Sequence, residues 1–258
     1  MSFRYHDGLR EEYQTTGLIV LRDLIPATLL TDLRGETDKA RAIARREHGI
    51  QAQRLQPVYR YPEIDPRPFR DFLNLSELQK VVENVLSKEH RQSNIMGVLL
   101  EPTEEAWATN WHRDWAHHIR NLSVERFETV KQNLRMFNQL NGALYEDGSL
   151  WAVPYSHNRP DTSEELSVFP QNPPTNPPLT PELSPEEREL VCLQYARSMP
   201  GAVQVPLGAG DVAFYRACMW HIGNYVPYRK RATLHDGFYC AEDLEWQKEM
   251  QMFQENYT

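Results

Sequence analysis

The residues best suited to chemistry lie at positions 110–118, where the sequence is Asn-Trp-His-Arg-Asp-Trp-Ala-His-His. His112 and Asp114 are separated by one residue, and side chains at positions i and i+2 of an extended strand point to the same face. An imidazole and a carboxylate on one face can bind the same ion. These ligands suit iron, manganese or zinc better than magnesium or calcium, so the pair predicts a metal site that needs a third ligand.

The third ligand has several candidates among the nine histidines of the chain. His221 is favoured because it follows a predicted strand and lies in Trp-His-Ile-Gly-Asn, where small and polar residues let the backbone turn near an ion. His235 is the alternative because it also lies in a strand-like segment, and His117 and His118 remain open. Two histidines and one carboxylate with open positions form the facial triad of non-haem Fe(II) oxygenases.

The elements in the first half of the chain are mostly helical. Residues 7–15 predict a short polar helix ended by Gly17, and residues 18–21 predict a buried strand. Pro26 opens a long helix that ends at Gly49, and Ser76 is expected to cap a second helix whose apolar residues recur at helical spacing. Residues 95–100 predict a strand leading toward the metal-binding pair, and residues 123–133 predict an amphipathic helix.

The second half of the chain is rich in short strands. Residues 136–140, 148–153 and 203–205 are strand candidates, and three more strands are expected between residues 210 and 239. Seven prolines between residues 158 and 184 exclude a central strand there, so this stretch is expected to be a long surface loop that could cap a cleft. Helices are expected at 184–197 and from 241 to the end. The pattern favours an all-β core flanked by helices.

Composition limits the classes of partner. The 258 residues are 40% hydrophobic and 25% charged, which is typical of a globular protein with one large domain, here residues 1–258. A net charge of -8 argues against nucleic acid and anionic membranes as partners. Three scattered cysteines indicate no disulfide framework, and no apolar run could serve as an export signal or membrane span. We expect a cytoplasmic monomer or small homo-oligomer.

Several motifs together resemble the phytanoyl-CoA dioxygenase family of Fe(II)/2-oxoglutarate-dependent oxygenases. The segment 16–26 is similar to that family's opening strand and helix, and Trp-His-Arg-Asp-Trp (111–115) resembles its His-x-Asp motif. Residues 148–157 are similar to a strand that ends in Pro-Gly-Ser-His, and residues 210–214 resemble the strand before the distal histidine. The resemblance covers about residues 13 to 240, and five motifs in the expected order make it specific.

The resemblance implies a double-stranded β-helix, the cupin-like jelly roll, with Fe(II) held by His112, Asp114 and His221. It also implies that 2-oxoglutarate and O2 bind at the iron, with the far carboxylate of 2-oxoglutarate on Arg231. Arg229 is an alternative because it shares strand parity with Arg231. Asn224 and Phe137 are further residues that the family pattern places at the co-substrate, although Phe137 could equally be part of the core.

Two departures from the family pattern concern the co-substrate side of the site. Tyr155 stands where the family usually has the glycine of Pro-Gly-Ser-His. Gly223 stands two residues after His221, where a small hydroxyl residue is common, so one hydrogen bond to the co-substrate is expected to be missing or replaced.

The expected activity is hydroxylation of a small molecule, with release of succinate and CO2. Aromatic rings and positive charge around the expected mouth predict an acidic or polar substrate. Two alternatives stay open: a jelly-roll metal enzyme that does not use 2-oxoglutarate, and a non-catalytic binding module on the same fold. The substrate contacts are expected among Trp111, Trp115, His117, His118, Arg120 and Arg216.

Overall fold

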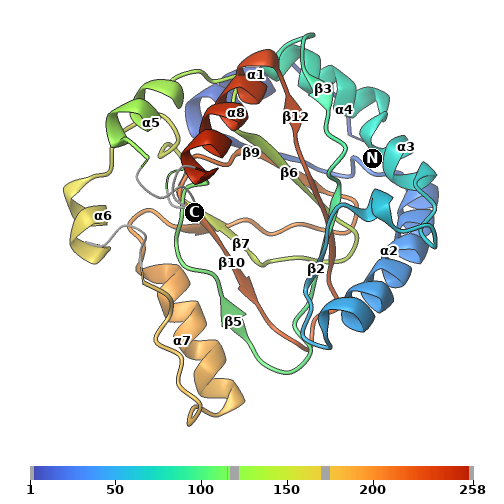
Figure 1. Cartoon of the computed structure of the whole chain (residues 1–258), viewed down its shortest axis with the longest axis vertical. Coiled ribbons are helices and arrows are strands. Elements are labelled where there is room, and N and C mark those ends of the chain that lie inside the picture. The colour runs from blue at the N-terminus through green and yellow to red at the C-terminus, as the bar shows by residue number, and fades with distance from the viewer. Residues whose placement is uncertain (1–2, 115, 117–121, 170–174, 256–258) are drawn as a thin grey trace.

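Two antiparallel sheets form the centre of the molecule in the computed structural model, which describes residues 3–114, 116, 122–169 and 175–255 (Figure 1). One sheet has six strands in the order β1-β9-β6-β11-β4-β2, and the other has four in the order β5-β10-β7-β8. Strands that are distant in sequence are neighbours in both sheets. This arrangement is the double-stranded β-helix, so the predicted β core with flanking helices is confirmed.

The six-stranded sheet supplies most of the apolar core. Its strands are β1 (Leu18–Leu21), β2 (Arg54–Leu55), β4 (Gly97–Leu100), β6 (Asn138–Ala143), β9 (Val212–Arg216) and β11 (Ala232–Asp236). Alternation gives the sheet two different faces. On β11, Leu234 packs into the apolar core, whereas His235 lines the space between the two sheets.

The four-stranded sheet is shorter. It contains β5 (Trp107–Ala108), β7 (Leu150–Ala152), β8 (Val203–Gln204) and β10 (His221–Tyr225). A separate pair is formed by β3 (Arg91–Gln92) and β12 (Phe238–Tyr239). Small apolar residues such as Ala143, Ala152 and Ala213 fill part of the space between the two large sheets, which lets the sheets approach closely.

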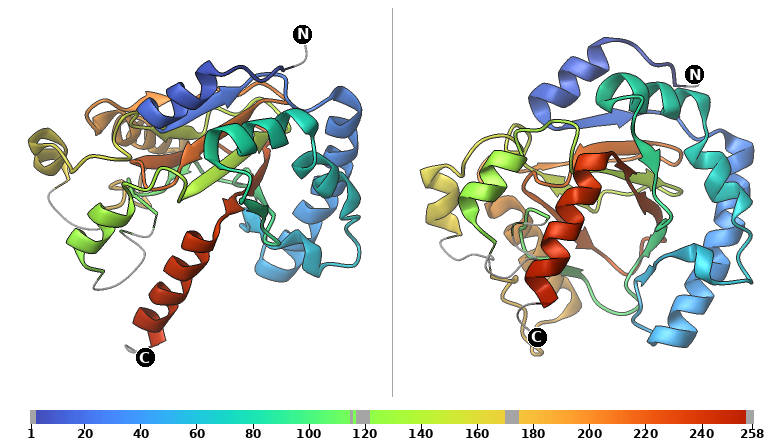
Figure 2. Two further views of the ribbon diagram at one scale, coloured as in Figure 1. Left: turned by 90° about the horizontal axis from the view of Figure 1, so that it is seen from above. Right: turned by 45° about the horizontal axis from the view of Figure 1, so that its top comes forward.

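Helices cover the outer faces of the sheets (Figure 2). The N-terminal helices pack on the six-stranded sheet through buried residues such as Leu33, Phe69 and Leu78. They are α1 (Gly8–Thr16), α2 (Ala27–His48), the 3-10 turn η1 (Val58–Arg60), α3 (Arg67–Leu73) and α4 (Ser76–Val81), which continues as the π-helix η2 (Val82–Leu86).

The later helices cover the other sheet and one end of the molecule. Helix α7 (Pro185–Ser198) packs against β5 and β10 and begins with a capping box in which Ser184 and Glu187 bond reciprocally. Helices α5 (Val124–Val130) and α8 (Ala241–Glu255) share a smaller apolar cluster. Helix α6 (Ser163–Val168) lies inside the proline-rich stretch, where no helix was predicted.

Several predicted details need correction. The segment around His112 is not a continuous strand, because only His112 forms an isolated bridge, opposite His221. Ser76 is the first residue of α4, and Leu75 occupies the cap position. Strand β6 begins at Asn138, two residues later than expected, because Phe137 has a left-handed φ of 60° that interrupts the extended backbone.

No helix in the described part of the chain is both long and apolar enough to cross a bilayer.

Candidate metal centre and its pocket

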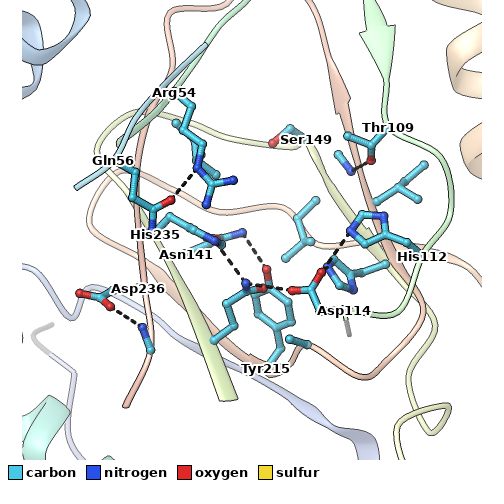
Figure 3. A pocket seen from close by; sticks show the side chains of 18 of the residues that line it. Arg54, Gln56, Thr109, His112, Asp114, Asn141, Ser149, Tyr215, His235 and Asp236 are labelled. Atoms are coloured by element: carbon cyan, nitrogen blue, oxygen red, sulfur yellow. Dashed lines mark hydrogen bonds and ion pairs between the residues drawn. The ribbon is translucent and has the colours of Figure 1, made fainter. Parts of the chain in front are cut away.

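A cavity of about 690 Å³ opens between the two sheets, and residues from both sheets line it. Strand alternation places polar side chains of β6, β10 and β11 on its walls. The lining includes Arg54, Gln56, Thr109, His112, Asp114, Gln139, Asn141, Ser149, Tyr215, His221, Tyr225, Arg231 and His235. Figure 3 shows His112 and Asp114 on one side of this cavity, with Arg54 and Gln56 on the other.

Backbone hydrogen bonds fix His112, Asp114 and His221 relative to one another. The His112 N–H donates to the His221 carbonyl at 3.2 Å, and the His221 N–H donates to the His112 carbonyl at 3.0 Å. The Asp114 N–H donates to the Ala217 carbonyl at 2.8 Å. Two segments more than a hundred residues apart are therefore joined at the point where their side chains meet.

The side chains of these three residues converge. Their candidate ligand atoms all lie within 4.8 Å of one another. Asp114 Oδ1 is 3.7 Å from His112 Nε2 and 4.0 Å from His221 Nε2. Of the histidines left open by the sequence, His221 is thus the one that joins the pair within the described residues, and His235 stays outside the group.

Both histidine rings are oriented by main-chain carbonyls. His112 Nδ1 lies 2.7 Å from the Asn110 carbonyl, and His221 Nδ1 lies 2.9 Å from the Met219 carbonyl. A carbonyl only accepts, so each Nδ1 carries a proton, and each ring directs its Nε2 toward Asp114. This outer contact is typical of metal-binding histidines. The donor set and its orientation fit a divalent transition metal such as Fe(II).

A chain of polar side chains orients the aspartate. Gln139 Nε2 donates to Asp114 Oδ2 at 3.2 Å and also lies 3.2 Å from His235 Nε2. His235 Nδ1 in turn lies 2.9 Å from Asn141 Oδ1. Burial, followed by the charge of Arg54, lowers the pKa of His235 to about 3, so its ring is neutral and accepts from Gln139. Asp114 is therefore held with Oδ1, and not Oδ2, toward the two histidines.

Arg231 lies at the end of the cavity in a buried ion pair with Asp147. Its Nε donates to Asp147 Oδ2 at 2.8 Å, and Thr233 Oγ1 donates to the same oxygen at 2.6 Å. Burial would raise the pKa of Asp147, but Arg231 and the hydrogen bonds from Ser149 and Thr233 outweigh it and hold that pKa at about 2. Asp147 thus balances much of the charge that Arg231 brings to the cavity.

Gly223 is required by the ring of Tyr225. A Cβ built on Gly223 would lie 1.8 Å from the Tyr225 Oη, so any side chain there would displace the phenol. The Tyr225 ring is fixed from both sides, with the Trp107 ring centroid at 5.0 Å and Arg231 Cζ at 4.9 Å. The family pattern usually has a hydroxyl residue at the position of Gly223. Here Tyr225 supplies a hydroxyl at that place instead.

The other residues expected at the co-substrate are placed differently. The turn before β11 carries Arg229 to the surface, where its side chain is exposed and does not line the cavity. The structure therefore does not support the alternative that Arg229 points inward. Asn224 alternates away from the cavity, unlike its neighbours Gly223 and Tyr225. Phe137 lines the cavity, but its ring also packs against Trp246 at a centroid distance of 5.6 Å.

Two residues expected to contact substrate lie elsewhere. Trp111 is fully buried beside helix α7, where its Nε1 donates to the Tyr195 carbonyl. Arg216 is also fully buried, and it donates to the carbonyls of Lys131, Asn133 and Met136. Neither residue lines the cavity, so the structure does not place Trp111 or Arg216 where a ligand in the cavity would contact it. The remaining expected contacts, Trp115, His117, His118 and Arg120, lie outside the described residues.

The proline-rich stretch does not reach the cavity in the part that is described. Asp161 binds Arg113 behind the metal ligands at 2.7 Å, and the Thr162 and Glu165 capping box begins α6. Residues 158–169 and 175–184 contribute nothing to the cavity lining. Whether the stretch closes on a ligand stays a prediction.

A second group of possible ligands consists of His90, Cys240 and Asp243. His90 contacts Ser87 Oγ through Nδ1 and the Arg135 carbonyl through Nε2, both at 2.9 Å. Asp243 accepts from the N–H and the thiol of Cys240. These ligand atoms are occupied by hydrogen bonds inside the fold.

Sequence reasoning missed the roles of Arg54, Gln139 and Asp147. Gln139 and Asn141 alternate with Asn138 and Leu140, so a polar stripe on one face of β6 was a usable signal. Asp147 stands before Gly148 in an Asp-Gly pair, which is typical of a turn and gives no sign of a buried ion pair. Arg54 gave no signal, because a two-residue strand has no periodicity to read.

The fold and the cavity define a jelly-roll protein with a candidate metal site formed by His112, Asp114 and His221. Residues 13–224 match the family model described as phytanoyl-CoA dioxygenase (PhyH). The chain therefore belongs to the phytanoyl-CoA dioxygenase family. No curated protein matches it in sequence.

Solved structures show the same fold at low sequence identity. AviO1 from Streptomyces viridochromogenes Tue57 is 16% identical over 93% of this chain and 97% of its own, with a TM-score of 0.59. SnoK, a non-haem alpha-ketoglutarate-dependent carbocyclase from nogalamycin biosynthesis, is 15% identical over 92% and 85%, with a TM-score of 0.60. EctD from S. alaskensis with bound Fe is 15% identical over 93% and 78%, with a TM-score of 0.59.

Proposed function

We propose that the protein is an Fe(II)- and 2-oxoglutarate-dependent dioxygenase that hydroxylates a small, polar or acidic molecule and releases succinate and CO2. The observation that carries the proposal is the convergence of His112, Asp114 and His221 on the wall of a cavity that also contains Arg231. Membership of the phytanoyl-CoA dioxygenase family supports it. A structure of EctD with 2-oxoglutarate and 5-hydroxyectoine also has this fold, at 15% identity and a TM-score of 0.59.

The residues of the chain divide the work as follows. His112, Asp114 and His221 would hold the iron on one face and leave its other positions to ligands. When bound, iron and 2-oxoglutarate supply the activation of O2 and the oxidation of a C–H bond. Gln139 holds the aspartate in a single orientation, and Tyr225 and Arg231 present a hydroxyl and two terminal amino groups at the end of the cavity. A planar guanidinium suits a carboxylate there.

One observation favours a second candidate. Asp147 already binds Arg231, so the guanidinium could be a structural ion pair in a jelly-roll metal enzyme that does not use 2-oxoglutarate. In that case the metal site would be intact while 2-oxoglutarate would have no anchor.

Anaerobic titration of Fe(II)-loaded protein with 2-oxoglutarate tests the proposal. We expect the visible metal-to-ligand charge-transfer band, its absence in His112→Ala, and an affinity weaker by about 10-fold or more in Arg231→Ala, because a charge-assisted pair is lost. Arg229→Ala is the matched control, since that arginine is exposed and should leave the titration unchanged. Iron bound without any band would favour the second candidate.

A further inference from the structure

Arg54 extends from the edge of the six-stranded sheet into the cavity. Strand β2 pairs with β4, with Arg54 opposite Leu99 and Leu55 opposite Val98. Leu55 is buried in the core, so alternation turns Arg54 to the opposite face, which is the cavity face. Figure 3 shows its guanidinium directed toward His235 and Asn141, across the cavity from His112.

Arg54 has no carboxylate partner among the described residues. Its side-chain hydrogen bond within the described residues goes to a neutral partner: Nε donates to Gln56 Oε1 at 2.6 Å. Gln56 is itself fixed, because its Nε2 donates to the Ile95 carbonyl at 2.7 Å. Gln56 therefore holds the Arg54 guanidinium in one direction, and no carboxylate among the described residues contacts that guanidinium.

Arg54 and Arg231 differ in whether a carboxylate of the chain already binds them, and this difference indicates which arginine would bind an added anion more strongly. Arg231 shares the cavity, but Asp147 lies 2.8 Å from its Nε and offsets its charge. Burial lowers the pKa of Arg54, opposed mainly by the charge of Asp114, so Arg54 lacks the stabilisation that Arg231 receives. As a whole residue, Arg54 is exposed and not buried, so an anionic ligand would pair with its guanidinium without displacing a carboxylate of the described chain.

The neighbours of Arg54 suit an oxyanion. His235 is neutral, and Gln56 and Asn141 are uncharged amides; among the described residues the cavity carboxylates Asp114, Asp236 and Asp243 make no ion pair with Arg54. A guanidinium binds a carboxylate or a phosphate through two parallel hydrogen bonds. The face of Arg54 that does not contact Gln56 is available for such a pair.

We infer that Arg54 is the anchor for an anionic group, a carboxylate or a phosphate, on the molecule that is oxidised. This inference rests on the proposed function and gives the substrate its chemical class. The same kind of group also occurs on 2-oxoglutarate, so the test must separate the two sources.

Phenylglyoxal modification, read by peptide mass spectrometry, measures access to Arg54 without any need for the natural substrate. The probes are benzoate and inorganic phosphate, added to anaerobic Fe(II)- and 2-oxoglutarate-loaded protein, with benzamide and chloride as the uncharged and ionic-strength controls. At ten times its Kd a ligand fills about 90% of its sites, so modification of Arg54 should slow by about 10-fold. Arg60 is exposed six residues away and should react at an unchanged rate.

The second arm repeats the 2-oxoglutarate titration with Arg54→Gln and Arg54→Lys. We expect the co-substrate affinity to stay within about twofold of the wild type in both, because Arg231 and not Arg54 holds its carboxylate. A loss of about 10-fold in Arg54→Gln, or protection of Arg54 by 2-oxoglutarate alone, would assign the anion to the co-substrate and overturn the inference. Equal modification of Arg54 with and without both oxyanions would overturn it as well.

The two proposals fail in different ways. If the wild type binds Fe(II) but shows no charge-transfer band, the co-substrate proposal is wrong, and the protection experiment on Fe(II)-loaded protein still decides whether Arg54 binds an oxyanion.

Discussion

Two groups of side chains in the described part of the chain bring their ligand atoms close enough to share an ion, but their surroundings differ. His112, Asp114 and His221 line a cavity, and main-chain carbonyls contact the Nδ1 atoms of the two rings. In the second group, Cys240 and Asp243 bond to each other, and both nitrogens of His90 have protein partners. Ligand spacing alone therefore does not define a metal site; the ligand atoms must also face a space that can hold the ion.

The second group has a structural task instead. Asp243 accepts from the backbone N–H groups of Phe137 and Cys240, which ties the start of α8 to the beginning of β6. An acidic residue in the first turn of a helix also complements the helix dipole. The comparison predicts that changes in one group alter metal affinity and changes in the other alter folding.

The largest expected effect is the loss of metal binding in His221→Ala. Removing a partner of a ligand typically costs 10- to 100-fold in metal affinity, so removing a ligand should cost about 100-fold or more. Competition with a chelator under anaerobic conditions measures the Fe(II) affinity. His90→Ala is the matched control, and an equal loss in that variant would break the distinction between the two groups.

Asp243→Ala should lower the free energy of unfolding by about 3 kcal/mol, because it leaves buried donors of Phe137 and Cys240 without an acceptor. Urea denaturation measures this change. Glu245→Ala, an exposed carboxylate on the same helix, should have almost no effect. The Fe(II) affinity of folded Asp243→Ala should match the wild type; a large drop would mean that this group takes part in metal binding.

His157 lies outside both groups and links the comparison to the pH dependence of stability. His157 is fully buried, its Nε2 donates to the Gln14 carbonyl, and burial followed by the charge of Arg216 lowers its pKa to about 4. Between the ordinary histidine value of 6.5 and pH 4 the unfolded chain binds a proton that the folded chain does not. Stability attributable to His157 is therefore present above this window and is lost as pH falls through it.

His157→Gln should flatten the dependence of unfolding free energy on pH between 6.5 and 4, by up to about 1.4 kcal/mol per pH unit. Urea denaturation at a series of pH values measures the slope. An unchanged slope in the variant would show that His157 is not responsible for acid sensitivity.

Gln139→Leu should have the smallest effect on the metal site, a loss of about 10-fold in Fe(II) affinity, because Asp114 remains but loses the donor that fixes Oδ2. Gln132→Leu is the control, since Gln132 is exposed and distant from the cavity lining. Equal Fe(II) affinities for Gln139→Leu and the wild type would mean that Asp114 needs no support from β6.

Much of the fold followed from the sequence because its signals were local. The apolar strand Leu18–Leu21 and the long helix Ala27–His48 have clear periodicity and ends, and both were predicted within a residue or two. Residue spacing suggested the metal-binding pair, and the order of the motifs favoured His221 over His235. These inferences needed no knowledge of distant contacts.

The rest depended on contacts that no local pattern reveals. The positive charge of Arg216 suggested a substrate contact, but three backbone carbonyls bind it in the interior. Tyr155 replaces a usual glycine and adopts a left-handed φ of 67°, which glycine adopts without the steric cost of a Cβ. Arg54 is brought to the cavity only by its pairing with β4.

The contact between Gly223 and Tyr225 makes these two positions interdependent for anyone who redesigns the site. Adding a methyl group at 223 alone would force the phenol out of its place between Trp107 and Arg231. Shortening Tyr225 first would remove that obstacle, so the double substitution should be less harmful than the sum of the single ones. A search that changes one residue at a time would reject serine at position 223, although the pair of changes could restore a hydroxyl to the cavity.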